Sequence, residues 1–116
     1  MSTVANIVIA VVAILHLWFL TLEMFLWNKP LGLKTFGMTL ETANASATLA
    51  ANQGLYNGFL AAGLIWGLWT NAFEIKVFFL ICVLIAGLFG GLTARRSILY
   101  FQALPAALGL LLFLAR

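Results

Sequence analysis

Four long apolar runs, separated by shorter polar stretches, dominate the pattern of the chain. They cover residues 4–27, 48–69, 75–93 and 98–115. A helix rises about 1.5 Å per residue and the hydrocarbon core of a bilayer is about 30 Å thick, so each run is close to the length of a membrane span. Because the links are short, consecutive helices should be antiparallel neighbours. The pattern therefore predicts an all-α fold: an integral membrane up-down four-helix bundle, forming a single domain over residues 1–116.

The long polar stretch at residues 28–47 divides into two parts. Residues 29–37 contain turn-forming residues, and Pro30 cannot continue the first helix. Thr39 is a suitable N-cap, and an acidic residue follows in the first turn, where the helix dipole favours an anion. We therefore expect the second helix to begin near Leu40 and to end at about residue 69. At roughly 45 Å it would extend beyond the bilayer on the side of this loop.

The composition agrees with a membrane location. Of 116 residues, 65% are hydrophobic and 8% are charged, which is too little polar surface for a soluble domain of this size. The basic residues are scattered along the chain, which argues against nucleic-acid binding. Cys82 is the single cysteine, so the sequence predicts no disulfide and no thiolate metal cluster. Membrane lipids are the expected partners, and assembly of several copies of the chain is left open.

The positions of the basic residues predict an orientation. The two links on one side of the bundle contain four of the six, whereas the opposite side has two. The first group is Lys29, Lys34, Arg95 and Arg96, and the second is Lys76 and Arg116. Because positive charge favours the cytoplasmic side, we expect loops 28–47 and 94–97 in the cytoplasm and both termini outside. The margin is modest, so a dual topology stays open.

Two ionisable residues lie inside the first apolar run. His16 and Glu23 are seven positions apart, which puts them about 20° apart on one helical face. A carboxylate in the hydrocarbon is costly unless it is paired, hydrated or protonated, so such a residue is a candidate functional group. The alternatives are structural: Glu23 could reach the headgroups from the end of the run, and a neutral His16 could hydrogen-bond between helices.

The second run carries the densest polar cluster, and the last run adds one amide. The cluster consists of Asn52, Gln53, Tyr56 and Asn57, and their i, i+4 spacing confines them to an arc of about 140°. Counted from the cytoplasmic ends, Glu23, the first two cluster residues and Gln102 lie at one depth. We therefore expect one polar pocket that deepens toward His16. Trp27 fits an aromatic belt at the membrane interface, and a role as roof of the pocket is the alternative. Interhelical packing by amides and glycines is the structural alternative.

Three strings carry a resemblance to a known family: residues 16–27, residues 49–67, and residues 101–106 after a pair of arginines. They resemble the small bacterial membrane proteins grouped as domain of unknown function 1304, over nearly the whole chain. The matching residues are His16, Glu23, Asn52, Gln53, Gly54, Tyr56, Asn57, Arg96, Gln102 and Pro105. The resemblance implies a four-span protein of the bacterial inner membrane and carries over no mechanism.

The residues support functions of different classes. The first is a carrier or binding protein for a small molecule, in which Glu23 couples a proton, His16 shares it and the amides bind the ligand. The second is a membrane enzyme acting on a lipid, quinone or isoprenoid, with His16 and Glu23 as acid and base and Tyr56 as a proton donor.

A third class is an accessory membrane subunit, in which the polar cluster serves only to join helices. A metal site is disfavoured because one histidine and one carboxylate are too few for a complete set of ligands. The residues identify no cofactor.

Overall fold

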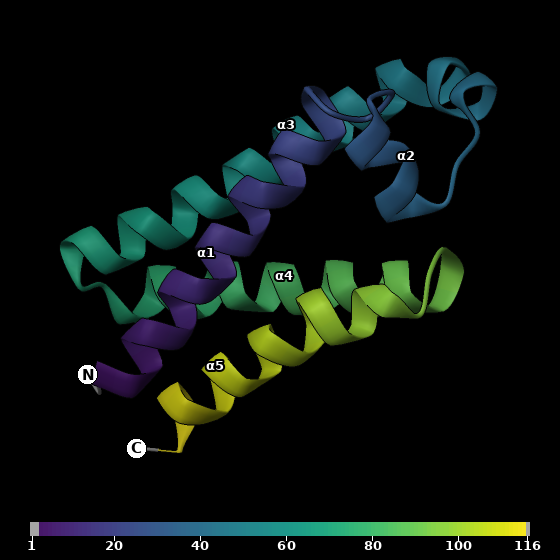
Figure 1. Cartoon of the computed structure of the whole chain (residues 1–116). Coiled ribbons are helices and arrows are strands. Elements are labelled where there is room, and N and C mark those ends of the chain that lie inside the picture. The colour runs from purple at the N-terminus through teal and green to yellow at the C-terminus, as the bar shows by residue number, and fades with distance from the viewer. Residues whose placement is uncertain (1–2, 116) are drawn as a thin grey trace. The chain divides into compact units, whose positions relative to one another are not determined.

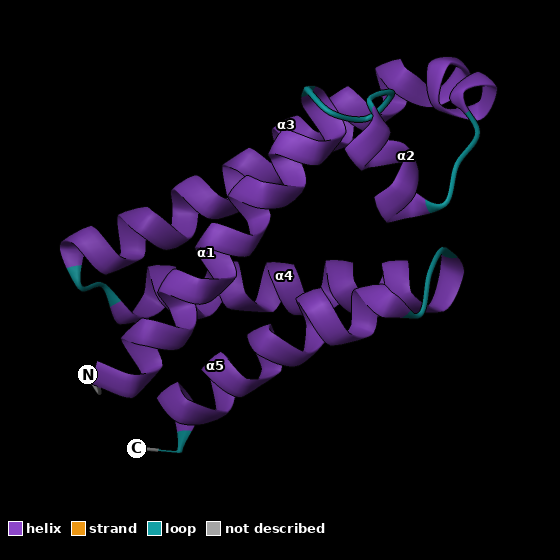
Figure 2. Cartoon of the chain, in the orientation of Figure 1, coloured by secondary structure: helices purple, strands orange, loops and turns teal. Residues whose placement is uncertain are grey.

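The computed structural model describes residues 3–115, which are almost entirely helical (Figures 1 and 2). The elements in chain order are α1 (Thr3–Met24), α2 (Pro30–Phe36), α3 (Leu40–Thr70), α4 (Phe73–Thr93), the π-helical segment η1 (Leu99–Ala103) and α5 (Leu104–Leu114). These residues contain no strand, which confirms the all-α prediction. Arg116, which was counted in the charge balance, lies outside the described residues.

The first helix ends earlier than predicted, and a short helix follows it. α1 stops at Met24, and in the turn after it the Leu26 amide donates to the Thr21 carbonyl at 3.1 Å. Instead of the expected turns, Pro30–Phe36 form α2, with Pro30 in the first turn. Gly37 ends α2 in the left-handed conformation, at φ 64°. A proline that fixes φ at the start and a glycine at the end are favourable helix boundaries, which explains why this polar segment is helical.

The second long helix begins and ends nearly as predicted. α3 begins at Leu40, and the amide of Thr42 donates to the side-chain oxygen of Thr39 at 3.2 Å. The predicted N-cap is therefore confirmed. The helix ends at Thr70, one residue beyond the expected end, and its 31 residues span roughly 46 Å.

The last apolar run does not form one uniform helix. Residues Leu99–Ala103 form η1, in which the amide of Leu104 donates to the carbonyl of Leu99, five residues back. Pro105 follows in the first turn of α5. Because proline has no N–H and its ring crowds the preceding turn, a wider turn before it relieves that conflict. The distortion before this proline is therefore a π-helical turn.

The chain divides into two compact units. One combines residues 1–15 with residues 60–116, and the other consists of residues 16–59; we call them unit one and unit two. In unit one, η1 and α5 run back along α4 (Figure 1). Its buried core joins the start of α1, the end of α3, α4 and α5 through Ala5, Ile9, Val12, Ala13, Leu64, Leu80, Val83, Ala106, Leu110 and Phe113.

Two of the described helices, α1 and α4, are long and apolar enough to cross a membrane, by length and composition alone. α3 does not meet that test, and the apolar segment Leu99–Leu114 is shorter. Polar residues lower the mean hydropathy of α3, and η1 interrupts the expected fourth span. Two of the four predicted spans therefore have the length and composition of a membrane-crossing helix. Large apolar side chains are nevertheless exposed along the helices, among them Ile7, Ile14, Leu55, Phe59, Ile85, Phe89, Leu104 and Leu111.

Candidate functional site

The candidate site in unit two is built where α1 and α3 approach each other closely. A Cβ atom at Gly54 would lie 2.6 Å from Cγ of Met24, and one at Gly58 would lie 2.8 Å from Cδ1 of Leu20. These distances are shorter than van der Waals contact, so a side chain at either position would force the neighbouring side chain of α1 to move. Gly54 and Gly58 of α3 therefore face α1.

At this close approach a buried amide contacts a buried carboxylate. Nδ2 of Asn57, on α3, donates a hydrogen bond to Oε1 of Glu23, in the last turn of α1. The exposed fractions of the two side chains are 9% and 8%. Among the residues that the structure describes, Glu23 pairs with this neutral amide and with no cation. The carboxylate thus has little contact with solvent, and its hydrogen-bond partner is a neutral side chain.

The other three members of the α3 cluster do not share this burial. Asn52, Gln53 and Tyr56 are exposed, and the Tyr56 ring packs edge-on against Phe59 at 5.9 Å between ring centres. The buried positions of α3 follow a spacing of three, four and seven residues: Ala43, Ala50, Gly54, Asn57 and Ala61. Asn57 lies at the edge of that buried face, whereas Gln53 lies about 80° and Asn52 about 180° from its centre.

His16 is fully buried on α1, seven residues before Glu23. Its ring meets that of Phe19 edge-on, with 5.3 Å between the ring centres. The rise of a helix separates His16 from Glu23 by roughly 10 Å along the axis. The two residues therefore cannot exchange a proton directly, as their sequence spacing already indicated.

Trp27 lies in the turn after α1 and links three segments of unit two. Its Nε1 donates to Oγ of Ser46 on α3 at 3.1 Å, and its ring packs against Phe36 of α2 at 4.9 Å between centres. A Cβ atom at Gly32 of α2 would lie 2.0 Å from the carbonyl oxygen of Leu26. Trp27 and this backbone contact fix the loop after α1 to the first turns of α3. The contact with Ser46 was not predicted, because the two residues are 19 positions apart.

Gln102 and the other sequence-predicted residues lie in separate units. Gln102 is half-buried within η1 of unit one, whereas Glu23 and Asn57 belong to unit two. The matched depth of these residues on three helices therefore stays a prediction.

Unit one contains a second buried polar group that the sequence reasoning missed. Lys76 was assigned to a membrane surface, but the structure buries it completely. Its Nζ donates to Oδ1 of Asn6 and to Oδ1 of Asn71, both at 2.8 Å, and lies 5.4 Å from the centre of the Phe113 ring. Gly67 leaves room for the lysine stem, since a Cβ atom there would lie 2.8 Å from Cγ of Lys76. Two amide oxygens and an aromatic face thus stabilise the ammonium.

Comparisons with known proteins agree with the resemblance found in the sequence. The family model described as "Protein of unknown function (DUF1304)" matches residues 10–114. The chain is similar to "Uncharacterized protein YpaA" of Lactococcus lactis subsp. lactis (strain IL1403), with 28% identity over 114 residues that cover 94% of this chain and 96% of that protein. No solved structure matches the chain. The match across both helices of the Glu23–Asn57 pair and across α4 and α5 shows that this chain belongs to the DUF1304 family.

Proposed function

We propose that this protein is an integral membrane protein of the bacterial inner membrane that crosses the bilayer four times. α1 and α4 have the length and composition of spans. α3, at roughly 46 Å, exceeds the hydrocarbon thickness of about 30 Å, and tilt or a segment outside the bilayer accommodates the difference. The segment Leu99–Leu114, at roughly 24 Å, spans most of that thickness. Loops 28–47 and 94–97 then face the cytoplasm and both termini face outside.

Within this architecture, we infer that unit two binds or transports a small molecule and that Glu23 takes up and releases a proton. One observation carries this proposal: a buried carboxylate in a membrane span is paired with the neutral amide of Asn57. An intramembrane carboxylate without a cationic partner is a favourable site for binding a proton or a cation. The exposed amides of Asn52 and Gln53 continue along α3 from this pair and supply hydrogen-bonding groups for a ligand.

The test is transport by the purified protein in proteoliposomes. Ethidium, an amphiphilic cation, is measured by fluorescence while a pH gradient is imposed across the membrane. We expect ethidium flux that depends on the gradient in the parent protein and loss of that flux in Glu23→Gln, which keeps the shape and the acceptor oxygen but cannot release a proton. Glu41→Gln is the matched control, because Glu41 is an exposed carboxylate in the first turn of α3, and it should transport like the parent.

Absence of flux in the parent, together with equal ethidium binding by the parent and Glu23→Gln, would contradict this function. The same outcome would favour a second candidate, the accessory membrane subunit. The Asn57–Glu23 bond supports that candidate because it joins α1 to α3. If Glu23→Gln changes the unfolding temperature and nothing else, the pair serves to join helices.

The enzymatic alternative has less support from the contacts in unit two. His16, Glu23 and Tyr56 would have to act on one substrate, but Tyr56 has an exposed fraction of 56% and packs against Phe59. A role for these three residues in chemistry on a lipid, quinone or isoprenoid stays a prediction.

A further inference from the structure

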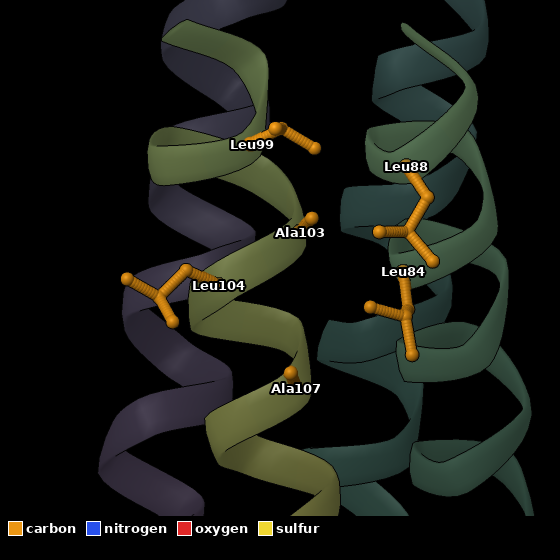
Figure 3. A pocket seen from close by; sticks show the side chains of 6 residues that line it. All are labelled: Leu84, Leu88, Leu99, Ala103, Leu104 and Ala107. Atoms are coloured by element: carbon orange, nitrogen blue, oxygen red, sulfur yellow. The ribbon is translucent and has the colours of Figure 1, made fainter. Parts of the chain in front are cut away.

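Unit one has an apolar groove between α4 and the segment that returns along it. The groove has a volume of about 230 Å³ and is lined by Leu84, Leu88, Leu99, Ala103, Leu104 and Ala107. In Figure 3, Leu84 and Leu88 of α4 face the side that carries Leu99 and Ala103. Pockets for complete small molecules usually measure about 300–1,000 Å³. The groove is therefore suited to a section of a thin apolar chain.

α4 and η1 pack closely beside this groove. A Cβ atom at Gly87 would lie 2.6 Å from the backbone nitrogen of Ala103, and one at Gly91 would lie 2.3 Å from Cγ of Leu99. α4 and η1 therefore approach more closely than side chains would allow. Ala103 and Ala107 are small, so the side chains that line the groove leave it open.

Two arginines lie at one end of the same hairpin. Arg95 and Arg96 are exposed in the link between α4 and η1, and Arg96 is three residues before Leu99, which lines the groove. Leu88 is about 7–8 Å along α4 from the end of that helix at Thr93. One end of the groove therefore lies close to the link that carries both arginines.

We propose that the groove holds one acyl chain of an anionic phospholipid whose phosphate binds Arg95 and Arg96. Lipid tails are as apolar as the leucines, so the chain gains little by leaving the bilayer for the groove, and selectivity must come from the headgroup. Arginine forks match phosphate oxygens in a bidentate geometry. Each basic residue near an anionic headgroup changes lipid affinity about fivefold. This inference rests on the proposed membrane location and is independent of Glu23.

Native mass spectrometry of the detergent-solubilised chain tests this site. The protein is titrated with phosphatidylglycerol and with phosphatidylcholine that carry the same acyl chains. We expect phosphatidylglycerol to bind more tightly, and the double variant Arg95→Gln/Arg96→Gln to lose about 25-fold of that affinity, the product of two fivefold effects. The matched control Lys29→Gln/Lys34→Gln removes two cations from another loop and should keep the preference.

A second pair of variants tests the groove itself. Ala107→Phe fills the groove and should lower the affinity for both lipids, while Leu108→Phe enlarges an exposed neighbour that is not part of the lining and should leave both affinities unchanged. Far-UV circular dichroism and gel filtration establish that each variant is folded.

Equal binding of the two lipids by the parent would overturn the proposal. Persistence of the preference in the arginine double variant would also overturn it, as would its loss in Lys29→Gln/Lys34→Gln. Unchanged affinity for both lipids in Ala107→Phe would show that the groove does not hold the acyl chain. Glu23→Gln should bind phosphatidylglycerol like the parent, so failure of the transport function and failure of this lipid site are separable.

Discussion

The carboxylate of Glu23 depends on one amide for its buried hydrogen bond. Replacing that amide by an apolar side chain of similar size, Asn57→Leu, leaves the buried carboxyl group without its donor. We expect the free energy of unfolding to fall by about 1–3 kcal/mol, measured by denaturant titration in detergent. Asn52→Leu, at an exposed position of the same helix, should change it by less than about 0.5 kcal/mol. Equal stability of Asn57→Leu and the parent would show that the bond contributes nothing.

The ammonium of Lys76 provides a second test at the scale of single residues. Asn6→Ala removes one of the two amide oxygens that accept its hydrogen bonds. The buried charge is then only partly satisfied, and we expect a loss of about 1–3 kcal/mol in the free energy of unfolding. Asn44→Ala is the matched control, because Asn44 makes an exposed amide–amide bond with Asn28. If both variants lose the same amount, burial of Lys76 does not explain the effect.

These two groups show what a sequence reveals about single residues. The apolar run around Glu23 made it a candidate functional group, and helical spacing put Asn57 in a polar cluster of the second run. Neither inference identified the bond between them, because the two residues are 34 positions apart. Asn52, Gln53 and Tyr56 share an arc with Asn57 but lie outside the buried face of α3, so their part in a ligand site stays a prediction. Burial of Lys76 was missed because its acceptor Asn6 is 70 positions away.

At the scale of elements, the contact between α4 and η1 depends on the absence of a side chain at Gly87. Gly87→Ala adds a Cβ atom 2.6 Å from the nitrogen of Ala103, and a backbone atom cannot turn aside. We expect the added atom to separate the two segments and to lower the free energy of unfolding by about 1–3 kcal/mol.

Gly90→Ala, in the same helix, is the control for that change. Its Cβ atom would lie 3.3 Å from methyl groups of the Ile98 side chain, which have more freedom to move than backbone. Thermal unfolding in detergent should therefore show little change for Gly90→Ala. A larger loss at Gly90 than at Gly87 would contradict the importance of the backbone contact.

The helix boundaries differ in how far local chemistry specifies them. The start of α3 was predicted because Thr39 supplies a cap to the residues directly after it. α2 was missed, although Pro30 and Gly37 are favourable boundary residues, because both are also frequent in turns. The end of α1 at Met24 was missed because the turn after it is fixed by Trp27 and by α2, through contacts made at a distance in the sequence.

At the scale of the whole molecule, the decisive measurement is the number of membrane crossings. In a Cys82→Ser background, single cysteines at Thr35, Ser97 and Glu74, all exposed positions, are labelled with an impermeant maleimide. We expect the cysteines at positions 35 and 97 to react from the cytoplasmic face and the one at position 74 from the opposite face, because positive charge favours the cytoplasmic side. Reaction of the cysteine at position 74 from the cytoplasmic face would show that α3 does not cross the membrane.

The apolar composition and the lengths of the runs predicted an all-α chain, and the structure confirms it. The number of spans could not be predicted in the same way. It depends on how a bilayer accommodates the polar residues of α3 and the interruption of the segment Leu99–Leu114 by η1. Hydropathy treats every polar residue as a cost. A hydropathy scale does not include the hydrogen bond that Asn57 donates to Glu23.

The first turns of α1 contribute a polar group to the surroundings of Lys76, in addition to their apolar side chains. Asn6 supplies from α1 an oxygen that α4 needs, while Asn71 supplies another from the link before α4, in a left-handed conformation at φ 50°. A generic polyleucine helix of the same length would cross a bilayer equally well but would leave the ammonium short of an acceptor. The identity of α1, and not merely its hydrophobicity, is therefore part of what allows α4 to pack in unit one.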